Sequence, residues 1–149
     1  MPSLKERIQE ETKAAMRAKD KARLATLRMI NAAIKQREVD ERTELNDEQV
    51  LAVLEKMLKQ RRESVEQYRK AGREELAAKE EAEMAVIREF LPEPLSEAEL
   101  DALIDAALAE TGAQSLRDMG KVMGKLRPQV QGRADMAQVS AKIKARLGA

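Results

Sequence analysis

Apolar residues recur along this chain at helical spacing, in segments separated by short polar or proline-containing stretches. Leu24, Leu27, Ile30 and Ile34 stand three, three and four positions apart, which places them on one face of a helix. This spacing predicts helices over about 4–19, 21–37, 47–71, 73–91, 97–110, 116–127 and 136–147. The predicted fold class is therefore all-α.

Short polar side chains mark where five of these helices begin. In each case Ser, Asn or Asp is followed three residues later by a side chain that can accept a hydrogen bond, as in a capping box. The pairs are Ser3 with Glu6, Asn46 with Gln49, Ser96 with Glu99, Ser115 with Asp118, and Asp135 with Gln138.

Other residues predict where helices end and which side chains face inward. The polar residues 39–46 predict a loop, and Gly72 is a plausible stop for the third helix. Pro128 is expected to end the sixth helix, because proline cannot continue the hydrogen-bond ladder. Met16 is expected on the inner face of the first helix.

The segment Leu91-Pro92-Glu93-Pro94 divides the chain. Two prolines two positions apart cannot continue a helix and hold the preceding residues in extended geometry. We therefore expect an N-terminal domain over residues 1–92, a bundle of about four helices, and a three-helix C-terminal domain over residues 95–149.

The composition limits the chemistry. Apolar residues make up 43% of the chain and charged residues 37%, with one Tyr and one Phe, so base stacking on exposed rings is disfavoured. The chain has no Cys and no His, which removes thiolate nucleophiles, imidazole bases and Cys/His zinc sites. We expect no metal site and no cofactor. The clustered Glu80, Glu81 and Glu83 are interpreted as a charged helix surface.

No segment has 18 consecutive apolar residues, and the N-terminal residues are charged throughout. These features predict neither a signal peptide nor a membrane span. A soluble cytoplasmic protein that does not contact a membrane is the expectation, and the sequence does not indicate an oligomeric state.

The net charge of +1 is unevenly distributed. Bases and acids cancel over residues 1–95, whereas residues 96–114 hold five acids and no base. Residues 115–149 hold eight bases and two acids, a net charge of +6. A basic module behind an acidic helix indicates a charged partner.

Two glycines lie four positions apart in the sixth predicted helix, Gly120 and Gly124, and each is followed by a lysine. A glycine inside a helix costs about 0.5–1 kcal/mol relative to alanine. One interpretation is that both glycines let this helix pack tightly against a neighbouring helix. The other is that they expose backbone to an RNA sugar-phosphate surface, with Lys121 and Lys125 neutralising phosphates.

The loop that follows offers a weaker anion site. Gly132 is expected to supply a backbone angle that other residues avoid, and Arg133 precedes the first turn of the last helix, where free N–H groups suit a phosphate. Asp135 as N-cap partly offsets that field, and a plain connecting turn is the alternative.

The run Lys56 to Arg73 holds seven bases, spread around the third helix. A solvated surface with ion pairs such as Arg62 to Glu66 is one interpretation, and a basic face for nucleic acid is the other. Tyr68 is expected in the core or at its boundary.

Four segments together carry a family resemblance: LRMINAAIKQREVD (27–40), KQRRESVEQYRKAGREEL (59–76), EFLPEPLSEAEL (89–100) and MGKVMGKLRPQVQGRADMAQVSAKIKARL (119–147). Over essentially its full length the chain resembles stand-alone YqeY proteins of the GatB/YqeY group. Its C-terminal part is also similar to the tail of the B subunit of the glutamine-dependent aminoacyl-tRNA amidotransferase.

The resemblance implies a two-part helical protein whose C-terminal unit helps to hold tRNA. The chain lacks the body of the B subunit, its kinase-like active site and any amidase triad. The residues expected to bind RNA are Gly120, Lys121, Gly124, Lys125, Arg127, Gly132 and Arg133.

Three functions follow from these observations. The first is a non-catalytic module that binds tRNA or another structured RNA through the C-terminal domain, in association with tRNA aminoacylation or amidation. The second is a protein–protein adaptor for a tRNA-modifying or synthetase complex. The third, by family association alone, is a carbon–nitrogen ligase with glutamine as amido-N-donor, although no independent activity is expected.

Overall fold

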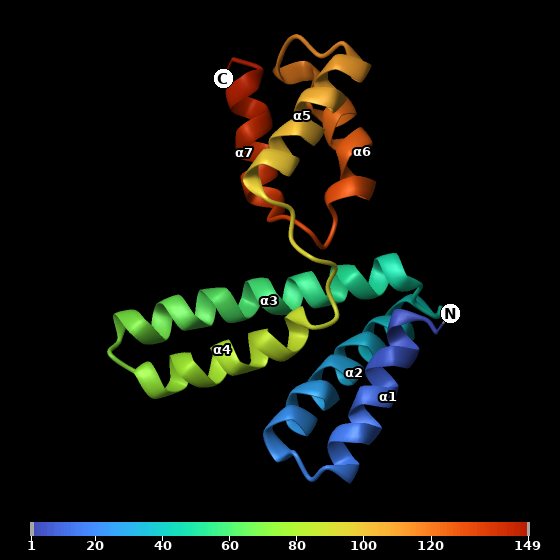
Figure 1. The fold of residues 1–149 in the computed structure, drawn as a ribbon, viewed down its shortest axis with the longest axis vertical. Helices are drawn as coiled ribbons and strands as arrows, with labels where there is room; N and C mark the ends of the chain where they lie inside the picture. Colours follow the sequence, from blue (N-terminus) through green and yellow to red (C-terminus); the bar gives the residue numbers. More distant parts are fainter. Residues whose placement is uncertain (1, 149) are drawn as a thin grey trace. The chain divides into compact units, whose positions relative to one another are not determined.

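A computed structural model describes residues 2–148, and their secondary structure consists of helices joined by short turns (Figure 1). The helices are α1 (Leu4–Arg17), α2 (Lys21–Glu41), α3 (Asp47–Lys70), α4 (Glu74–Arg88), α5 (Glu97–Thr111), α6 (Met119–Val130) and α7 (Met136–Arg146). A 3-10 turn, η1 (Leu116–Asp118), precedes α6. The all-α prediction is confirmed. Within residues 2–148, no helix combines the length and the apolar character needed to cross a bilayer.

The chain divides into two compact units, Met1–Leu91 (unit 1) and Pro92–Ala149 (unit 2). Unit 1 contains α1 to α4, with α3 packed along α4 and α1 along α2 (Figure 1). Unit 2 contains α5, α6 and α7. Each unit buries its own set of aliphatic side chains. The fully buried large ones are Ile8, Leu27, Ile30, Leu54 and Ile87 in unit 1, and Ile104, Leu126 and Ile143 in unit 2.

Most helix starts follow the predicted caps. The exception is α7, where Asp135 accepts from the Ala137 N–H at 3.0 Å and Gln138 donates to Glu97 instead of returning to the cap. The Ser3 hydroxyl accepts a hydrogen bond from the Glu6 N–H at 3.1 Å, and reciprocal capping boxes begin α3 and α5. An unpredicted cap begins α2, where Asp20 accepts from the Arg23 N–H at 3.2 Å. Each cap satisfies N–H groups that the helix itself leaves without a partner.

Two predictions in unit 1 are wrong. Met16 is 51% exposed, because it lies in the last turn of α1, about 100° around the helix from the buried Ala15. Residues 39–41 are helical rather than part of a loop. Local side-chain pairs extend α2 to this point: Gln36 donates to Asp40, and Arg37 pairs with Glu41.

In unit 2, α6 begins after the 3-10 turn and continues through Pro128 to Val130, so the prediction that Pro128 ends this helix is wrong. Because proline has no N–H, the carbonyl of Gly124 loses its hydrogen-bond partner four residues on. Gly124 and Pro128 are both exposed, so water can satisfy this carbonyl.

Candidate nucleic-acid interface

The outer face of α6 carries five of the seven residues predicted to bind RNA. Val122, Leu126 and Val130, spaced four residues apart, are buried in the core of unit 2 and fix the orientation of the helix. The opposite side is exposed and is called here the α6 face, which comprises Gly120, Lys121, Gly124, Lys125 and Arg127.

The two glycines of the α6 face do not serve packing within the described chain. A Cβ atom built on Gly120 or Gly124 would meet no atom within 4 Å among the neighbours considered. The interpretation that they allow close packing against α5 or α7 is therefore wrong. They leave a strip of bare helix backbone open to whatever approaches from outside.

Most of the positive charge on α7 is balanced within unit 2. The Lys142 ammonium lies 2.9 Å from both Glu97 and Asp101 of α5. The Arg146 guanidinium lies 3.2 Å from Asp101 and 3.1 Å from Asp105. Hydrogen bonding to Lys142 is the largest influence that lowers the pKa of Asp101 and of Glu97. These bases are thus engaged by the chain's own acids.

The bases of the α6 face are less engaged. Lys125 lies 3.1 Å from Glu110, but both side chains are more than half exposed, so the pair contributes little. Among residues 2–148, five bases of unit 2 have no carboxylate within 4 Å: Arg117, Lys121, Arg127, Arg133 and Lys144.

Gly132 and Arg133 lie in the loop between α6 and α7, not on the α6 face. Gly132 has a φ of 78°, as its predicted role requires. The Arg133 guanidinium donates to the Glu93 carbonyl at 2.9 Å, and the Arg133 carbonyl accepts from the Leu95 N–H at 2.9 Å. Arg133 therefore connects the segment before α5 to the loop before α7 through two hydrogen bonds.

The basic run on α3 is partly structural. Arg61 is 13% exposed and lies 3.8 Å from Glu80 and 3.6 Å from Glu83 of α4. Burial is the largest influence that raises the pKa of Glu83. The interpretation of Glu83 as part of a charged surface is wrong, because its side chain is only 13% exposed.

Tyr68 is half-buried against the core of unit 1, as expected. Glu66 pairs with Lys70 at 3.4 Å, and the described part of the chain shows no ion pair between Glu66 and Arg62.

Sequence reasoning passed over a set of cations on α2. Lys21, Arg28 and Lys35 follow one another at intervals of seven residues along this helix, and Arg42 continues the interval at its C-cap. All four residues are exposed. The regular spacing is present in the sequence. It was missed because the bases and acids of residues 1–95 were summed to a net charge of zero, which hides where the bases lie.

Comparisons with known proteins show which family this chain resembles. A family model described as Yqey-like protein matches residues 5–147. "Altered inheritance of mitochondria protein 41, mitochondrial" from Pyrenophora tritici-repentis is 35% identical, covering 96% of this chain and 80% of the relative. A protein of the same name from Eremothecium gossypii is 38% identical, covering 69% of this chain and 58% of the relative.

A further relative, an uncharacterized protein of Schizosaccharomyces pombe, is 34% identical, covering 64% of this chain and 78% of the relative. Neither the family description nor the names of these relatives state a catalytic activity.

The expectation of a cytoplasmic protein is contradicted by the relatives, because several of them are named as mitochondrial proteins. That expectation rested on the absence of membrane and signal segments. None of these features separates the cytosol from another reducing compartment.

Proposed function

This chain is a member of the Yqey-like protein family, and we propose that it is a non-catalytic module that binds structured RNA, with tRNA as the expected class. The α6 face is the proposed contact surface, and the proposed setting is tRNA aminoacylation or amidation. The observation that carries the proposal is the bare backbone at Gly120 and Gly124 beside the unpaired cations Lys121 and Arg127.

The geometry suits a sugar-phosphate backbone. Without Cβ atoms at Gly120 and Gly124, a ribose can approach the helix more closely than elsewhere on α6. Lys121 and Arg127 are then available to neutralise phosphates on either side, which fixes the position of an RNA strand without reading its bases. Such contacts release counterions, so binding is expected to weaken steeply as salt is added.

The carbonyl of Gly124 adds a means of preferring RNA to DNA. Pro128 removes its partner within the helix, and the carbonyl is on the exposed side. A ribose 2′-hydroxyl can donate a hydrogen bond to such an acceptor, whereas deoxyribose has no hydroxyl there. We therefore expect tighter binding to RNA than to DNA of the same shape.

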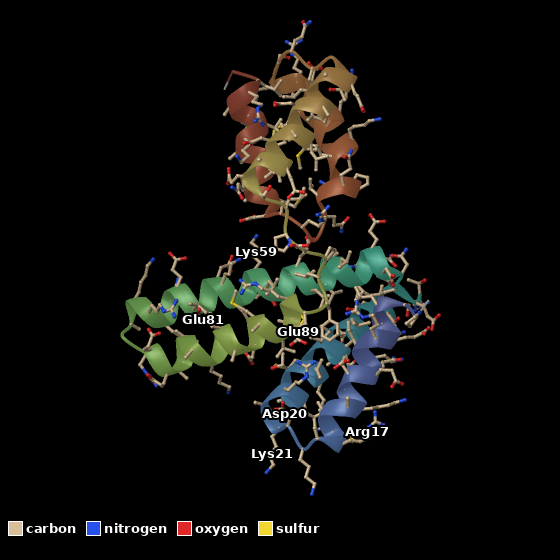
Figure 2. The ribbon with its side chains drawn as sticks, in the orientation of Figure 1. Arg17, Asp20, Lys21, Lys59, Glu81 and Glu89 are labelled. Atoms are coloured by element: carbon tan, nitrogen blue, oxygen red, sulfur yellow. The ribbon has the colours of Figure 1, made fainter. Side chains whose placement is uncertain are left out.

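The proposal is tested by filter binding of bulk tRNA at about 50 and 200 mM salt. The double variant Lys121→Glu/Arg127→Glu is expected to bind at least tenfold more weakly than the parent chain at the lower salt, since two phosphate contacts become repulsive. Its charge-matched control is Lys56→Glu/Lys59→Glu, two exposed positions on α3 (Figure 2 labels Lys59).

The control variant is expected to retain binding. If it loses as much affinity as the α6 variant, the loss does not depend on where the charges are changed, and the proposal for the α6 face fails. If the parent chain at low salt retains no more tRNA than the filter alone, the proposal is also overturned.

A protein–protein adaptor is the second candidate, because Leu116 is 48% exposed directly before α6. An apolar side chain beside a bare helix backbone also suits a partner helix. A pull-down after nuclease treatment separates the two functions. A stoichiometric protein partner that is lost with Leu116→Glu favours the adaptor, whereas recovery that requires RNA favours the first function.

The link to carbon–nitrogen ligase chemistry enters the proposal only through a possible partner complex. We expect the purified protein alone to show neither glutaminase nor tRNA-amidation activity, because the chain has no Cys or His to activate a nucleophile. Turnover that disappears when one polar residue is replaced would contradict the non-catalytic assignment.

A further inference from the structure

We infer that the exposed side of α2 is a second polyanion-binding surface, suited to the phosphates of an RNA duplex. The α2 ridge is defined by Lys21, Arg28, Lys35 and Arg42. An interval of seven residues corresponds to about 10.5 Å along a helix, so the four residues span about 31 Å. Because seven residues are close to two helical turns, Lys21, Arg28 and Lys35 lie along one side of α2.

The cations of the α2 ridge form no close ion pair within residues 2–148. Hydrogen bonding to Lys5 is the largest influence that lowers the pKa of Glu38, and the charge of Lys35 adds to it. No carboxylate among residues 2–148 lies within 4 Å of any of them, and the acids of α2 have other partners. Glu38 pairs with Lys5 at 2.6 Å, Glu41 pairs with Arg37, and Asp40 accepts from Gln36 at 2.9 Å. The ridge therefore presents unpaired positive charge to solvent.

The ridge is part of the most basic stretch of unit 1. Residues 13–37 contain eight bases and a single acid, Asp20, which gives a net charge of +7. Three of these bases pair with acids outside the stretch, namely Lys13, Arg23 and Arg37, and the others have no ion pair among residues 2–148. Asp20 is occupied as the N-cap of α2. Figure 2 shows Arg17 and Lys21 near it, close to the turn between α1 and α2. Positive charge thus continues from the ridge around the end of this helix pair.

The surroundings of the ridge favour a duplex over a single strand or a membrane. Tyr68 and Phe90, the two aromatic residues, are half-buried and buried, so unpaired bases have no exposed ring on which to stack. The apolar side of α2, which includes Leu27 and Ile30, is buried in the core and cannot enter a bilayer.

Small side chains between the cations allow a broad surface to approach. Ala25 and Ala32 are exposed and alternate with Lys21, Arg28 and Lys35 along the same side of α2. Lys and Arg side chains that stand above alanines can reach phosphates of a duplex laid across the helix. Contacts of this kind position a nucleic acid by its backbone and by its shape.

This inference rests on the proposed class of ligand, structured RNA, and adds a second surface to the α6 face. The two surfaces belong to different units of the chain, so their variants report separately. Loss of binding with α6 variants alone supports the proposed function and overturns the inference. Loss of binding with α2 variants alone does the reverse.

The test uses the full chain and an RNA hairpin with a stem of about 16 base pairs, a length that shape-reading RNA modules span. The variant is Arg28→Gln/Lys35→Gln, which removes two charges and keeps good helix-forming residues. We expect roughly tenfold weaker binding, and the slope of log K against log salt should fall by about two. The control is Lys56→Gln/Lys59→Gln on α3, with an unchanged slope expected.

Three outcomes would overturn the inference. The first is an unchanged slope for the α2 variant, and the second is an equal loss for the α3 control. The third is tighter binding of a single strand of the same composition than of the stem. Phosphatidylserine vesicles and a poly-glutamate peptide serve as other polyanions. If either binds through the α2 ridge more tightly than the stem, the ligand class is wrong.

Discussion

The bases of α7 in unit 2 lie against acids of the same unit, whereas the bases of the α2 ridge in unit 1 have no acid partner within the described chain. Lys142 and Arg146 share Asp101, with Glu97 and Asp105 on either side. The last 35 residues carry a net charge of +6, yet Lys142 and Arg146 are paired with acids of the same unit.

The difference shows that the charge of a segment and the charge available to a partner are separate quantities. Residues 96–114 carry the acids that face α7, and folding brings this acidic helix against the basic one. On the outer side of α2, the nearest acids along the chain are occupied by other bases. Availability therefore depends on which helices pack together.

The largest effect is expected from removing core support for the α6 face. Leu126→Ala truncates a fully buried side chain and should destabilise unit 2 by about 2–5 kcal/mol. Since a small unit has little stability in reserve, α5, α6 and α7 should lose protection in hydrogen exchange. RNA binding through the α6 face should be lost, whereas the contribution of the α2 ridge remains.

Leu54→Ala in unit 1 is the matched truncation, because Leu54 is equally buried. It should reduce protection in α1 to α4 and leave the α6 face in place. If both variants reduce protection evenly over residues 2–148, the two surfaces cannot be separated in this way.

Arg133→Gln is expected to produce the next largest effect. It removes the hydrogen bond from the guanidinium to the Glu93 carbonyl, which should lower the stability of unit 2 by about 1 kcal/mol. Chemical denaturation measures this loss. RNA affinity measured from low to higher salt then shows whether Arg133 also contacts phosphate. If Arg133 is purely structural, the slope of log K against log salt for the folded protein stays unchanged.

Much of the fold could be predicted from the sequence, because apolar spacing and capping residues act locally. Ser96 with Glu99 and the stripe of Leu24, Leu27, Ile30 and Ile34 depend on neighbours within one or two turns. The prediction that Pro128 ends α6 was wrong. A proline can stand within a helix where the carbonyl four residues earlier, which loses its hydrogen-bond partner, is accessible to water.

The candidate site was harder to predict than the fold. The openness of Gly124 and the pairing of Lys142 with Asp101 depend on which helices pack against α6 and α7. No spacing along the chain encodes that packing. The seven-residue spacing of the α2 ridge is present in the sequence. That these cations lie on the exposed side of α2 follows only from knowing which side of the helix is buried.

Asp101→Asn is expected to leave bases of α7 with fewer acid partners, as is the case for the bases of the α2 ridge. It removes the carboxylate shared by Lys142 and Arg146, so RNA binding should tighten by roughly twofold and become more sensitive to salt. Filter binding at two salt concentrations measures both changes. An unchanged affinity would mean that these bases do not reach RNA even when they are released.

The same variant has a distinct pH signature. Because Lys142 and Arg146 lower the pKa of Asp101 in the folded protein, its stabilising effect is present above its ordinary pKa of 3.8. The effect is lost as pH falls through the lowered value. The variant should therefore be less stable than the parent chain at pH 7. The difference should begin to shrink as pH falls below 3.8 and should disappear once pH is below the lowered pKa of Asp101. A difference that persists in acid would implicate packing instead of charge.

Gly124→Ala is expected to give the smallest effect. It should raise the stability of the protein and lower its affinity for tRNA. The added Cβ meets no atom within 4 Å, and alanine is the better helix former, so the protein should gain about 0.5–1 kcal/mol. The same methyl group would keep a ribose from the backbone, so tRNA affinity should fall. Gly112→Ala is the control for stability, because its φ of 65° makes alanine destabilising there. If Gly124→Ala stabilises the protein and leaves tRNA affinity unchanged, RNA does not approach this backbone, and the unpaired cations would have to act without it.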